Sequence, residues 1–245
     1  MRDALGFLTT LPVKSTRGPG RRSLACFPLV GLVVGLLWTA GAFAGDFIGG
    51  PLVAAAAVLL VDLKVTGGFH LDGVADTADG LATKHRPERI QQAIKDSRIG
   101  ALGSVTATTV LIVRFALLAS LAALPGWWWL LPAIPVCGRL VSLWMISRSR
   151  EREGSSAAGL RDMARGLPVA AALAGTVLAL AAALHLAHMP WWYAVPIVGA
   201  AVAGGETLYR SWEKHLGAHG DMLGAAAIAA EVIAAAGILV VAGHL

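Results

Sequence analysis

The sequence predicts an all-α fold, a polytopic membrane helix bundle that forms a single integral membrane domain over residues 1–245. Hydrophobic residues make up 56% of the chain and charged residues 14%, against roughly 25% charged residues in ordinary globular proteins. A soluble fold of this size lacks the polar residues to cover its surface at that composition. The same composition excludes a disordered chain.

Seven segments are apolar enough and of about the length, roughly 17–25 residues, that a membrane-spanning helix needs. The second and the sixth are short and carry Gly or Pro. The aromatic stretches 127–129 and 191–193 are typical of membrane–water interfaces. The predicted spans are residues 27–45, 50–65, 101–124, 127–147, 167–185, 191–207 and 222–241.

The Lys and Arg residues predict the orientation, because cytoplasmic loops of membrane proteins are enriched in them. Seventeen of the 20 lie in four polar segments, residues 1–22, 67–100, 148–166 and 210–214. The connections around Asp46, Pro125 and Met189, and the C-terminal tail, carry none. We therefore expect a cytoplasmic N-terminus and a C-terminus outside, without a cleaved signal peptide, in the cell (inner) membrane.

The net charge of +5 is explained by these loops rather than by nucleic-acid binding. A nucleic-acid site would combine a basic strip with interleaved aromatic residues, and the sequence has none. Cys26 and Cys137 show neither a metal-binding spacing nor a disulfide framework.

The chemistry is expected in the polar region 67–100, where three carboxylates follow a helical spacing. Asp72, Asp76 and Asp79 stand at i, i+4 and i+7. At about 100° per residue, a helix would place all three within an arc of about 60°. Like charges so close destabilise a helix, and no Lys or Arg is interleaved. A hard divalent cation bound through carboxylates and substrate phosphates would offset the repulsion.

Two other interpretations of this stretch stay open. It is also consistent with a solvated acidic loop, or with a first helical turn that favours anions. Gly67, Gly68 and Gly73 favour a ligand, because glycine lets the backbone approach it closely. His70 is a candidate ligand orienter, phosphate contact or base, and equally an ordinary interfacial histidine.

Two further polar signals flank apolar spans. Lys95 and Arg98 are candidates to hold phosphate oxygens, while Asp96 is placed to pair with them or to join a metal. The alternative for this segment is an interfacial anchor whose helix starts at Ser97. Asp221 precedes the last predicted span and is either a site residue or a helix N-cap.

Five charged residues lie within apolar segments, where charge is costly and usually functional. For each of them a structural ion pair and a substrate contact remain open. They are Asp62, Lys64, Arg114, Arg139 and Glu231.

Residues 67–81 (GGFHLDGVADTADGL) closely resemble the signature of the cobalamin synthase (adenosylcobinamide-GDP ribazoletransferase) family. The resemblance extends along nearly the whole chain, although only the acidic motif is highly specific. His219 stands where the family usually has Thr, whereas Asp221 matches. The other similar segments are residues 7–13 (FLTTLPV), 27–31 (FPLVG), 96–103 (DSRIGALG) and 220–225 (GDMLGA).

The resemblance implies a Mg²⁺-dependent transferase with its active site on the cytoplasmic side of the membrane. Its substrates would be adenosylcobinamide-GDP and α-ribazole or α-ribazole 5′-phosphate, and it would release GMP. Its partners would be the lipid bilayer and, as a further hypothesis, a second copy or other cobalamin-assembly enzymes.

The residues that match the motifs take their expected roles from this resemblance. Asp72 and Asp76 are expected metal ligands, Asp79 is a ligand or the general base, and Asp96 is a second-rank ligand. The expected substrate-binding residues are Lys84, Lys95, Arg98 and Asp221, and His70 is kept as a catalytic candidate.

Three other functions remain as alternatives. The clustered carboxylates also fit an enzyme like the membrane CDP-alcohol phosphotransferases, acting on another pyrophosphate. A transporter would use the intramembrane charges to line its pathway. A structural or assembly subunit would have no chemistry of its own.

Overall fold

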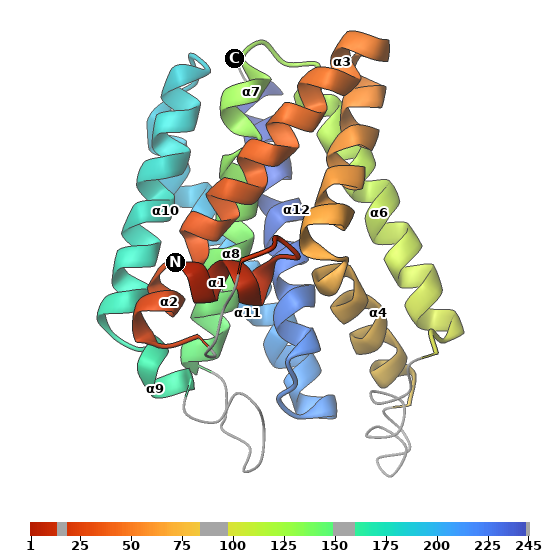
Figure 1. The fold of residues 1–245 in the computed structure, drawn as a ribbon, viewed down its shortest axis with the longest axis vertical. Helices are drawn as coiled ribbons and strands as arrows, with labels where there is room; N and C mark the ends of the chain where they lie inside the picture. Colours follow the sequence, from red (N-terminus) through yellow and green to blue (C-terminus); the bar gives the residue numbers. More distant parts are fainter. Residues whose placement is uncertain (14–18, 84–97, 149–159, 244–245) are drawn as a thin grey trace.

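The computed structural model describes residues 1–13, 19–83, 98–148 and 160–243 (Figure 1). Every regular element among these residues is helical, which confirms the predicted all-α class. Lys84, Lys95 and Asp96, to which the sequence assigns roles, lie outside the described residues. The elements are α1 (Arg2–Leu8), α2 (Arg21–Ala25), α3 (Phe27–Thr66), α4 (Phe69–Ala82), α6 (Ala101–Ala122), α7 (Trp127–Leu130), α8 (Ala133–Arg148), α9 (Leu160–Ala164), α10 (Leu167–Leu186), the 3₁₀ helix η1 (Trp191–Tyr193), α11 (Ala194–Leu216) and α12 (Asp221–Gly243).

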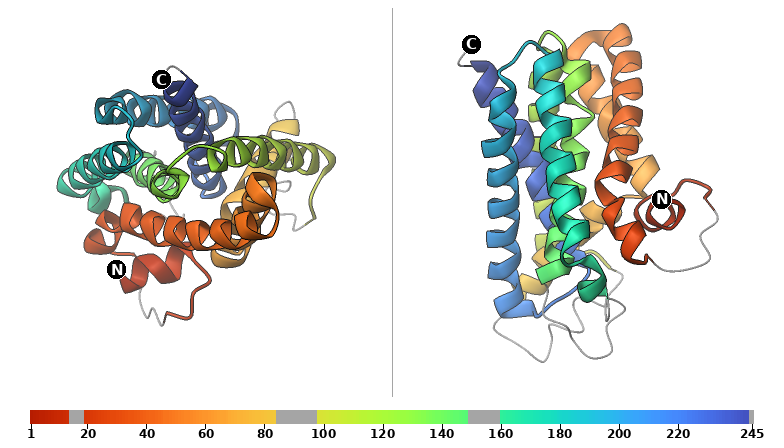
Figure 2. Two further views of the ribbon diagram at one scale, coloured as in Figure 1. Left: turned by 90° about the horizontal axis from the view of Figure 1, so that it is seen from above. Right: turned by 90° about the vertical axis from the view of Figure 1, so that its left-hand side faces the viewer.

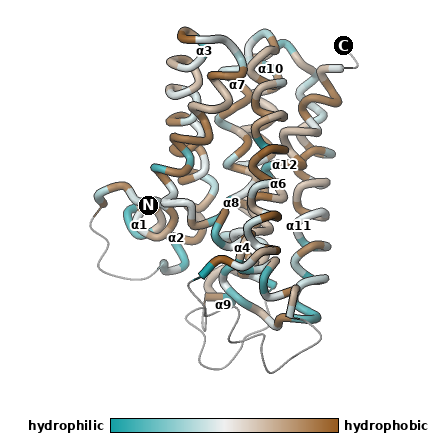
Figure 3. Tube along the Cα trace, turned by 90° about the vertical axis from the view of Figure 1, so that its right-hand side faces the viewer, coloured by the Kyte–Doolittle hydropathy of each residue, from teal (hydrophilic) through white to brown (hydrophobic). Residues whose placement is uncertain are grey.

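Five helical segments of the described chain are long and apolar enough to cross a membrane. They are α3, α6, α7 with α8, α10 and α12. The first two predicted spans both fall within α3, and the sixth falls on η1 and α11, which is not among the five. Hydrophobic residues cover the shafts of the bundle, and hydrophilic ones gather towards the end that carries α4 and α9 (Figure 3). The number of seven crossings and their orientation stay predictions.

Helix α3 is a helical hairpin rather than one straight rod (Figure 1). Gly50 has φ 74° and ψ −162°, a backbone conformation almost confined to glycine, and Pro51 then starts the second arm. The arms pack closely and antiparallel, because a Cβ at Gly45 would lie 2.5 Å from the Val53 carbonyl oxygen. The predicted break between residues 45 and 50 therefore falls where the chain reverses.

Helix α8 lies at the centre of the bundle (Figure 2). It packs against α3, α10, α11 and α12, and almost all of its residues are buried. Its buried residues include Arg139, and a charged side chain in a membrane span almost always faces the interior of the bundle. Leu140 and Leu143 of α8 belong to the main hydrophobic core.

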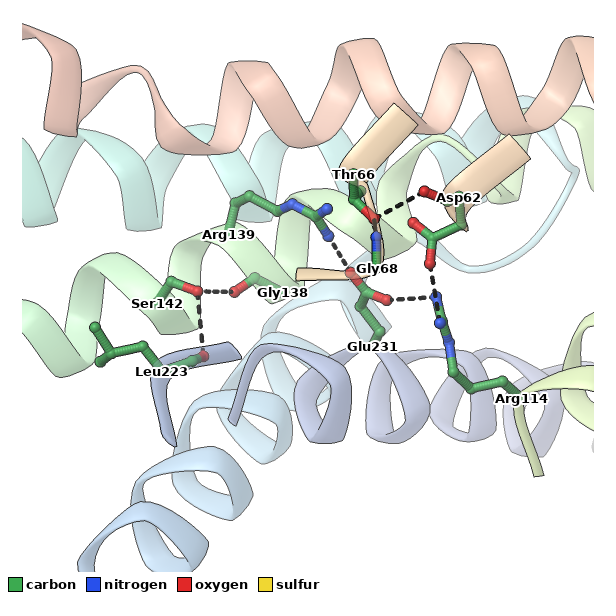
Figure 4. Close-up of polar contacts among 9 residues, drawn as sticks. All are labelled: Asp62, Thr66, Gly68, Arg114, Gly138, Arg139, Ser142, Leu223 and Glu231. Atoms are coloured by element: carbon green, nitrogen blue, oxygen red, sulfur yellow. Dashed lines mark hydrogen bonds and ion pairs between the residues drawn. The ribbon is translucent and has the colours of Figure 1, made fainter. Parts of the chain in front are cut away.

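Four charged side chains pair with one another inside the bundle (Figure 4). Arg114 of α6 donates to Asp62 of α3 and to Glu231 of α12, each at 3.0 Å, and Arg139 of α8 also donates to Glu231. Gly138 leaves the room for Glu231 to approach α8, because a Cβ there would lie 2.7 Å from its Oε1. Of the two alternatives left open by the sequence, the structure shows ion pairs for these four residues, and the pairs link four helices.

The junction between α3 and α4 is closed by the N-terminal segment. Gly67 and Gly68 both have positive φ, which ends α3 and lets the chain turn into α4. The Thr10 hydroxyl donates to the Lys64 carbonyl at 2.6 Å, and the Thr10 amide donates to the Val65 carbonyl at 2.8 Å. These bonds satisfy carbonyls that a helix end leaves without a partner.

The close packing of α3 on α8 predicts a selective effect of adding a methyl group. A Cβ at Gly35 would lie 2.5 Å from the Pro132 carbonyl oxygen, so Gly35→Ala forces the helices apart. We expect a loss of about 1–3 kcal/mol, the usual cost of overpacking. Thermal unfolding in detergent should show a lower Tm for Gly35→Ala. Gly199→Ala is the matched control, since a Cβ there meets nothing within 4 Å, and an equal Tm for both variants would contradict the packing argument.

Candidate active site

The acidic motif forms a helix, as its spacing predicts. Helix α4 covers Phe69–Ala82, so Asp72, Asp76 and Asp79 lie along one face. The Asp72 side chain is exposed, whereas Asp76 and Asp79 are partly buried. The described end of the bundle thus presents a row of carboxylates at the surface of a helix that packs on α6 and α12.

Asp79 is already engaged by the protein. Its Oδ2 accepts the amide of Gly100 and its Oδ1 accepts the amide of Gly103, both at 2.7 Å. Gly100 is the N-cap of α6 and Gly103 lies in its first turn. The Asp79 carboxylate therefore binds α4 to the start of α6.

Asp221 joins the carboxylates from another helix. It is the first residue of α12, and a Cβ at Gly73 would lie only 2.3 Å from its carbonyl oxygen. The absence of a side chain at Gly73 therefore lets the N-terminus of α12 lie directly on α4. Asp221 is also close enough to Asp76 to repel its charge. The structure thus brings together three predicted residues of α4 and one of α12.

The pKa of Asp76 is raised by its surroundings. Burial raises the pKa of Asp76 to about 6, and repulsion from Asp72, then Asp221 and Asp79, adds to the effect. A divalent cation would relieve this repulsion, and its preferred ligands are the oxygens present here. The donor set therefore fits Mg²⁺.

The carboxylates do not by themselves form a complete set of ligands for a metal ion. No group of three or more His, Cys, Asp or Glu side chains in the described chain is arranged to hold a metal ion. Mg²⁺ is usually bound by one or two carboxylates together with waters and substrate phosphates, so a complete set of protein ligands is not needed.

His70 lies away from the carboxylates. It precedes Asp72 by two residues, which places it on the opposite side of α4, and it is buried. Burial lowers the pKa of His70 well below its usual range, and the positive charges of Arg139 and Arg114 lower it further. His70 is therefore neutral at pH 7 and faces the buried ion pairs.

Two cavities flank α4, and the acidic side chains of α4 and Asp221 line neither of them. A cavity of about 390 Å³ lies between α3, α4 and α6, with Asp62, His70 and Arg114 among its lining residues. A cavity of about 340 Å³ lies between α4, α6, α11 and α12 and is almost wholly apolar. The carboxylates instead occupy the face of α4 that begins at the exposed Asp72.

Of the remaining predicted residues, Arg98 lies in the described part of the chain. Arg98 is exposed and precedes the N-cap of α6 by two residues, and this helix begins at Ala101. The sequence interpretation missed the backbone amides of Gly100 and Gly103 as partners of Asp79. The spacing of Gly100 and Gly103 at the start of α6 was the one feature of the sequence that pointed to these amides. Lys84, Lys95 and Asp96 lie outside the described residues.

The described residues define a helical membrane protein with clustered carboxylates at one end of the bundle, a donor set suited to cation-assisted phosphate chemistry. The chain belongs to the cobalamin-5-phosphate synthase family, whose pattern it matches over residues 1–239.

Three relatives are named adenosylcobinamide-GDP ribazoletransferase. That of Roseiflexus sp. (strain RS-1) is 32% identical over 240 residues, which cover 96% of this chain and 87% of the relative. That of Brevibacillus brevis is 34% identical over 186 residues, 75% of each chain. That of Desulfitobacterium hafniense is 42% identical over 126 residues, 49% of each chain. No solved structure matches the chain significantly.

The raised pKa of Asp76 predicts a pH-dependent gain in stability for Asp76→Asn. The pKa of an unfolded Asp is near 3.9, whereas that of folded Asp76 is about 6. Above pH 6 the Asp76 charge therefore lowers the free energy of unfolding. At pH 7.5 in EDTA, Asp76→Asn should raise the Tm by about 2–4 °C, the shift that about 1 kcal/mol gives in a chain of this size. The gain should shrink as the pH falls below 6 and vanish near pH 3, below the pKa of the unfolded Asp, where the carboxyl of residue 76 is neutral in both the folded and the unfolded state.

The control is Asp46→Asn, which makes the same replacement at a carboxylate in the α3 hairpin near its turn. Asp46→Asn should leave the Tm unchanged at both pH values. A lower Tm for Asp76→Asn at pH 7.5 would show that the Asp76 charge stabilises the fold.

Proposed function

We propose that this chain is a Mg²⁺-dependent adenosylcobinamide-GDP ribazoletransferase. It joins adenosylcobinamide-GDP to α-ribazole, or to α-ribazole 5′-phosphate, and releases GMP in the final steps of cobalamin synthesis. The observation that carries the proposal is the family match over residues 1–239, which includes the carboxylates of α4 and α12. The relatives' names supply the substrate and the reaction.

The reaction is a phosphoryl transfer. The hydroxyl of the ribazole attacks the phosphorus that bears the cobinamide, the bond from that phosphorus to the bridging oxygen breaks, and GMP leaves with that oxygen. The protein must position both substrates, offset phosphate charge and accept the hydroxyl proton. No nucleophilic side chain is needed, since the acceptor brings its own hydroxyl.

The described residues divide these tasks. Asp72 and Asp76 would hold Mg²⁺, which neutralises pyrophosphate charge when bound. Asp221, beside Asp76 at the start of α12, is the carboxylate that we assign to accept the proton, because both oxygens of Asp79 are bonded to amides. Arg98 is assigned to the pyrophosphate, together with the predicted Lys84 and Lys95.

We place the active site on the cytoplasmic side of the cell (inner) membrane, in a chain that crosses it seven times. Basic residues of separate segments meet at one end of the bundle: Arg210 donates to the Arg148 carbonyl at 3.2 Å, and Arg165 to the Ser147 carbonyl at 3.1 Å. Leu81 of α4 and Trp212 of α11 pack against one hydrophobic cluster, which includes Tyr209 and Leu216. The positive-inside rule assigns that end to the cytoplasm.

The transporter alternative is weakened by the pairing of the intramembrane charges. Asp62, Arg114, Arg139 and Glu231 form ion pairs with one another, as structural charges do. The family match likewise favours cobalamin synthesis over a phosphotransferase acting on another pyrophosphate.

Asp76→Asn tests the active site directly. The substitution keeps the size of the side chain but removes a charge that holds the cation. We expect GMP formation by purified protein, supplied with both substrates and Mg²⁺, to fall by about 10²–10³. Asp72→Asn should act similarly, with non-additive effects in the double variant. Exhaustive EDTA treatment should abolish turnover and Mg²⁺ should restore it.

Asp46→Asn, in the hairpin near its turn, should keep wild-type turnover. If Asp76→Asn keeps more than about a third of the turnover, a loss smaller than the factor of ten that corresponds to 1.4 kcal/mol, the carboxylates of α4 are not the active site. Full turnover after EDTA treatment would overturn the metal assignment.

The orientation is tested by cysteine labelling in a background without Cys26 and Cys137. Lys214→Cys places a thiol at the exposed end of α11, and Phe47→Cys places one at the exposed turn of α3. A membrane-impermeant maleimide should reach Phe47→Cys from outside intact cells and Lys214→Cys only after the membrane is opened. The reverse pattern would invert the proposed orientation.

A further inference from the structure

Asp79 is held differently from the other carboxylates of α4. Each of its two oxygens accepts one backbone amide, from Gly100 and from Gly103, at 2.7 Å. These donors belong to the N-cap and the first turn of α6, where helix amides lack partners within the helix. A side chain 21 residues earlier in the chain thus caps α6.

The surrounding backbone encloses this carboxylate. A Cβ at Gly100 would lie 2.5 Å from Asp79 Oδ1, and a Cβ at Gly103 would lie 2.3 Å from Oδ2. The same Cβ at Gly103 would lie 2.8 Å from the Ala75 carbonyl oxygen. Helix α6 therefore approaches α4 this closely only because both positions lack a side chain.

The contact also bears on the position of Arg98. Arg98 stands two residues before Gly100, so the hydrogen bond that the Gly100 amide donates to Asp79 holds Arg98 near the end of α4. The positive end of the α6 dipole is directed at the Asp79 carboxylate. Asp79 therefore takes up two of the amides that a substrate phosphate would otherwise use at the N-terminus of α6.

We propose that Asp79 is a positioning residue, which anchors α6 to α4 and thereby places Arg98 for the pyrophosphate, and is neither a metal ligand nor the general base. The kinetic part of this inference rests on the proposed function. The anchoring part rests on the hydrogen bonds and the glycine contacts alone.

The kinetic experiment compares two ways of breaking the anchor. Asp79→Ala removes the carboxylate, while Gly103→Ala keeps it and obstructs its place. Both should raise the KM for the GDP-bearing substrate about tenfold or more and leave the half-saturating Mg²⁺ concentration within about twofold. Asp79→Asn, which keeps an acceptor oxygen, should recover part of the loss. Asp76→Asn should instead raise the Mg²⁺ requirement, and Gly199→Ala, where a Cβ meets nothing, should change neither constant.

Amide hydrogen exchange gives a readout that needs no turnover. In Asp79→Ala and Gly103→Ala, the amides of residues 100–104 should exchange faster than in the wild type, whereas Asp76→Asn should leave them protected. Gly100→Ala serves as the second variant if Gly103→Ala does not fold.

The two readouts separate the outcomes. A tenfold higher Mg²⁺ requirement in Asp79→Asn, with Gly103→Ala like the wild type, would make Asp79 a metal ligand and overturn the proposal. Wild-type exchange at residues 100–104 in Asp79→Ala would overturn the anchor. A wild-type protein that forms no GMP would overturn the proposed function and the kinetic role of Asp79, and the exchange result would still decide the anchor.

Discussion

The buried pairing of Asp62, Arg114, Glu231 and Arg139 is the interaction on which the arrangement of the helices depends. These side chains come from α3, α6, α12 and α8, so one group of buried charges links four mostly apolar helices. Apolar surfaces in a membrane fit in many registers, because lipid tails are as apolar as the helices themselves. A buried charge left without its partner is strongly unfavourable, and the pairing therefore selects one register.

That register determines where the carboxylates lie. Helix α4 packs chiefly on α6 and α12, the two helices that Arg114 and Glu231 connect. Their N-termini then reach α4 at two glycines: Asp221 of α12 lies on Gly73, and Gly103 of α6 receives Asp79. The position of the surface carboxylates thus depends on the buried ion pairs. The neutral His70 faces the buried ion pairs, and Asp76 lies among the carboxylates.

The sequence predicted what depends on local period and composition. The helical class, the break between residues 45 and 50, the start of α6 at Ala101 and the shared face of the three carboxylates all follow from short-range patterns. The partners of Asp79 lie 21 and 24 residues away, so no periodicity within the motif reveals them. The side of α4 on which His70 lies follows from its spacing to Asp72, but its contact with the buried arginines depends on α6 and α8.

The difference between Asp76 and Asp79 shows why a spacing alone does not assign roles. Both are aspartates on the same face of one helix, three residues apart. Asp79 meets two backbone amides, which donate to its oxygens and so offset its charge within the protein. Burial raises the pKa of Asp76 to about 6, and repulsion from Asp72, Asp221 and Asp79 adds to the effect. A carboxylate with a perturbed pKa at such a cluster is a candidate functional group, so Asp76, rather than Asp79, is the centre of the candidate site, and the proposed Mg²⁺ would offset the repulsion there.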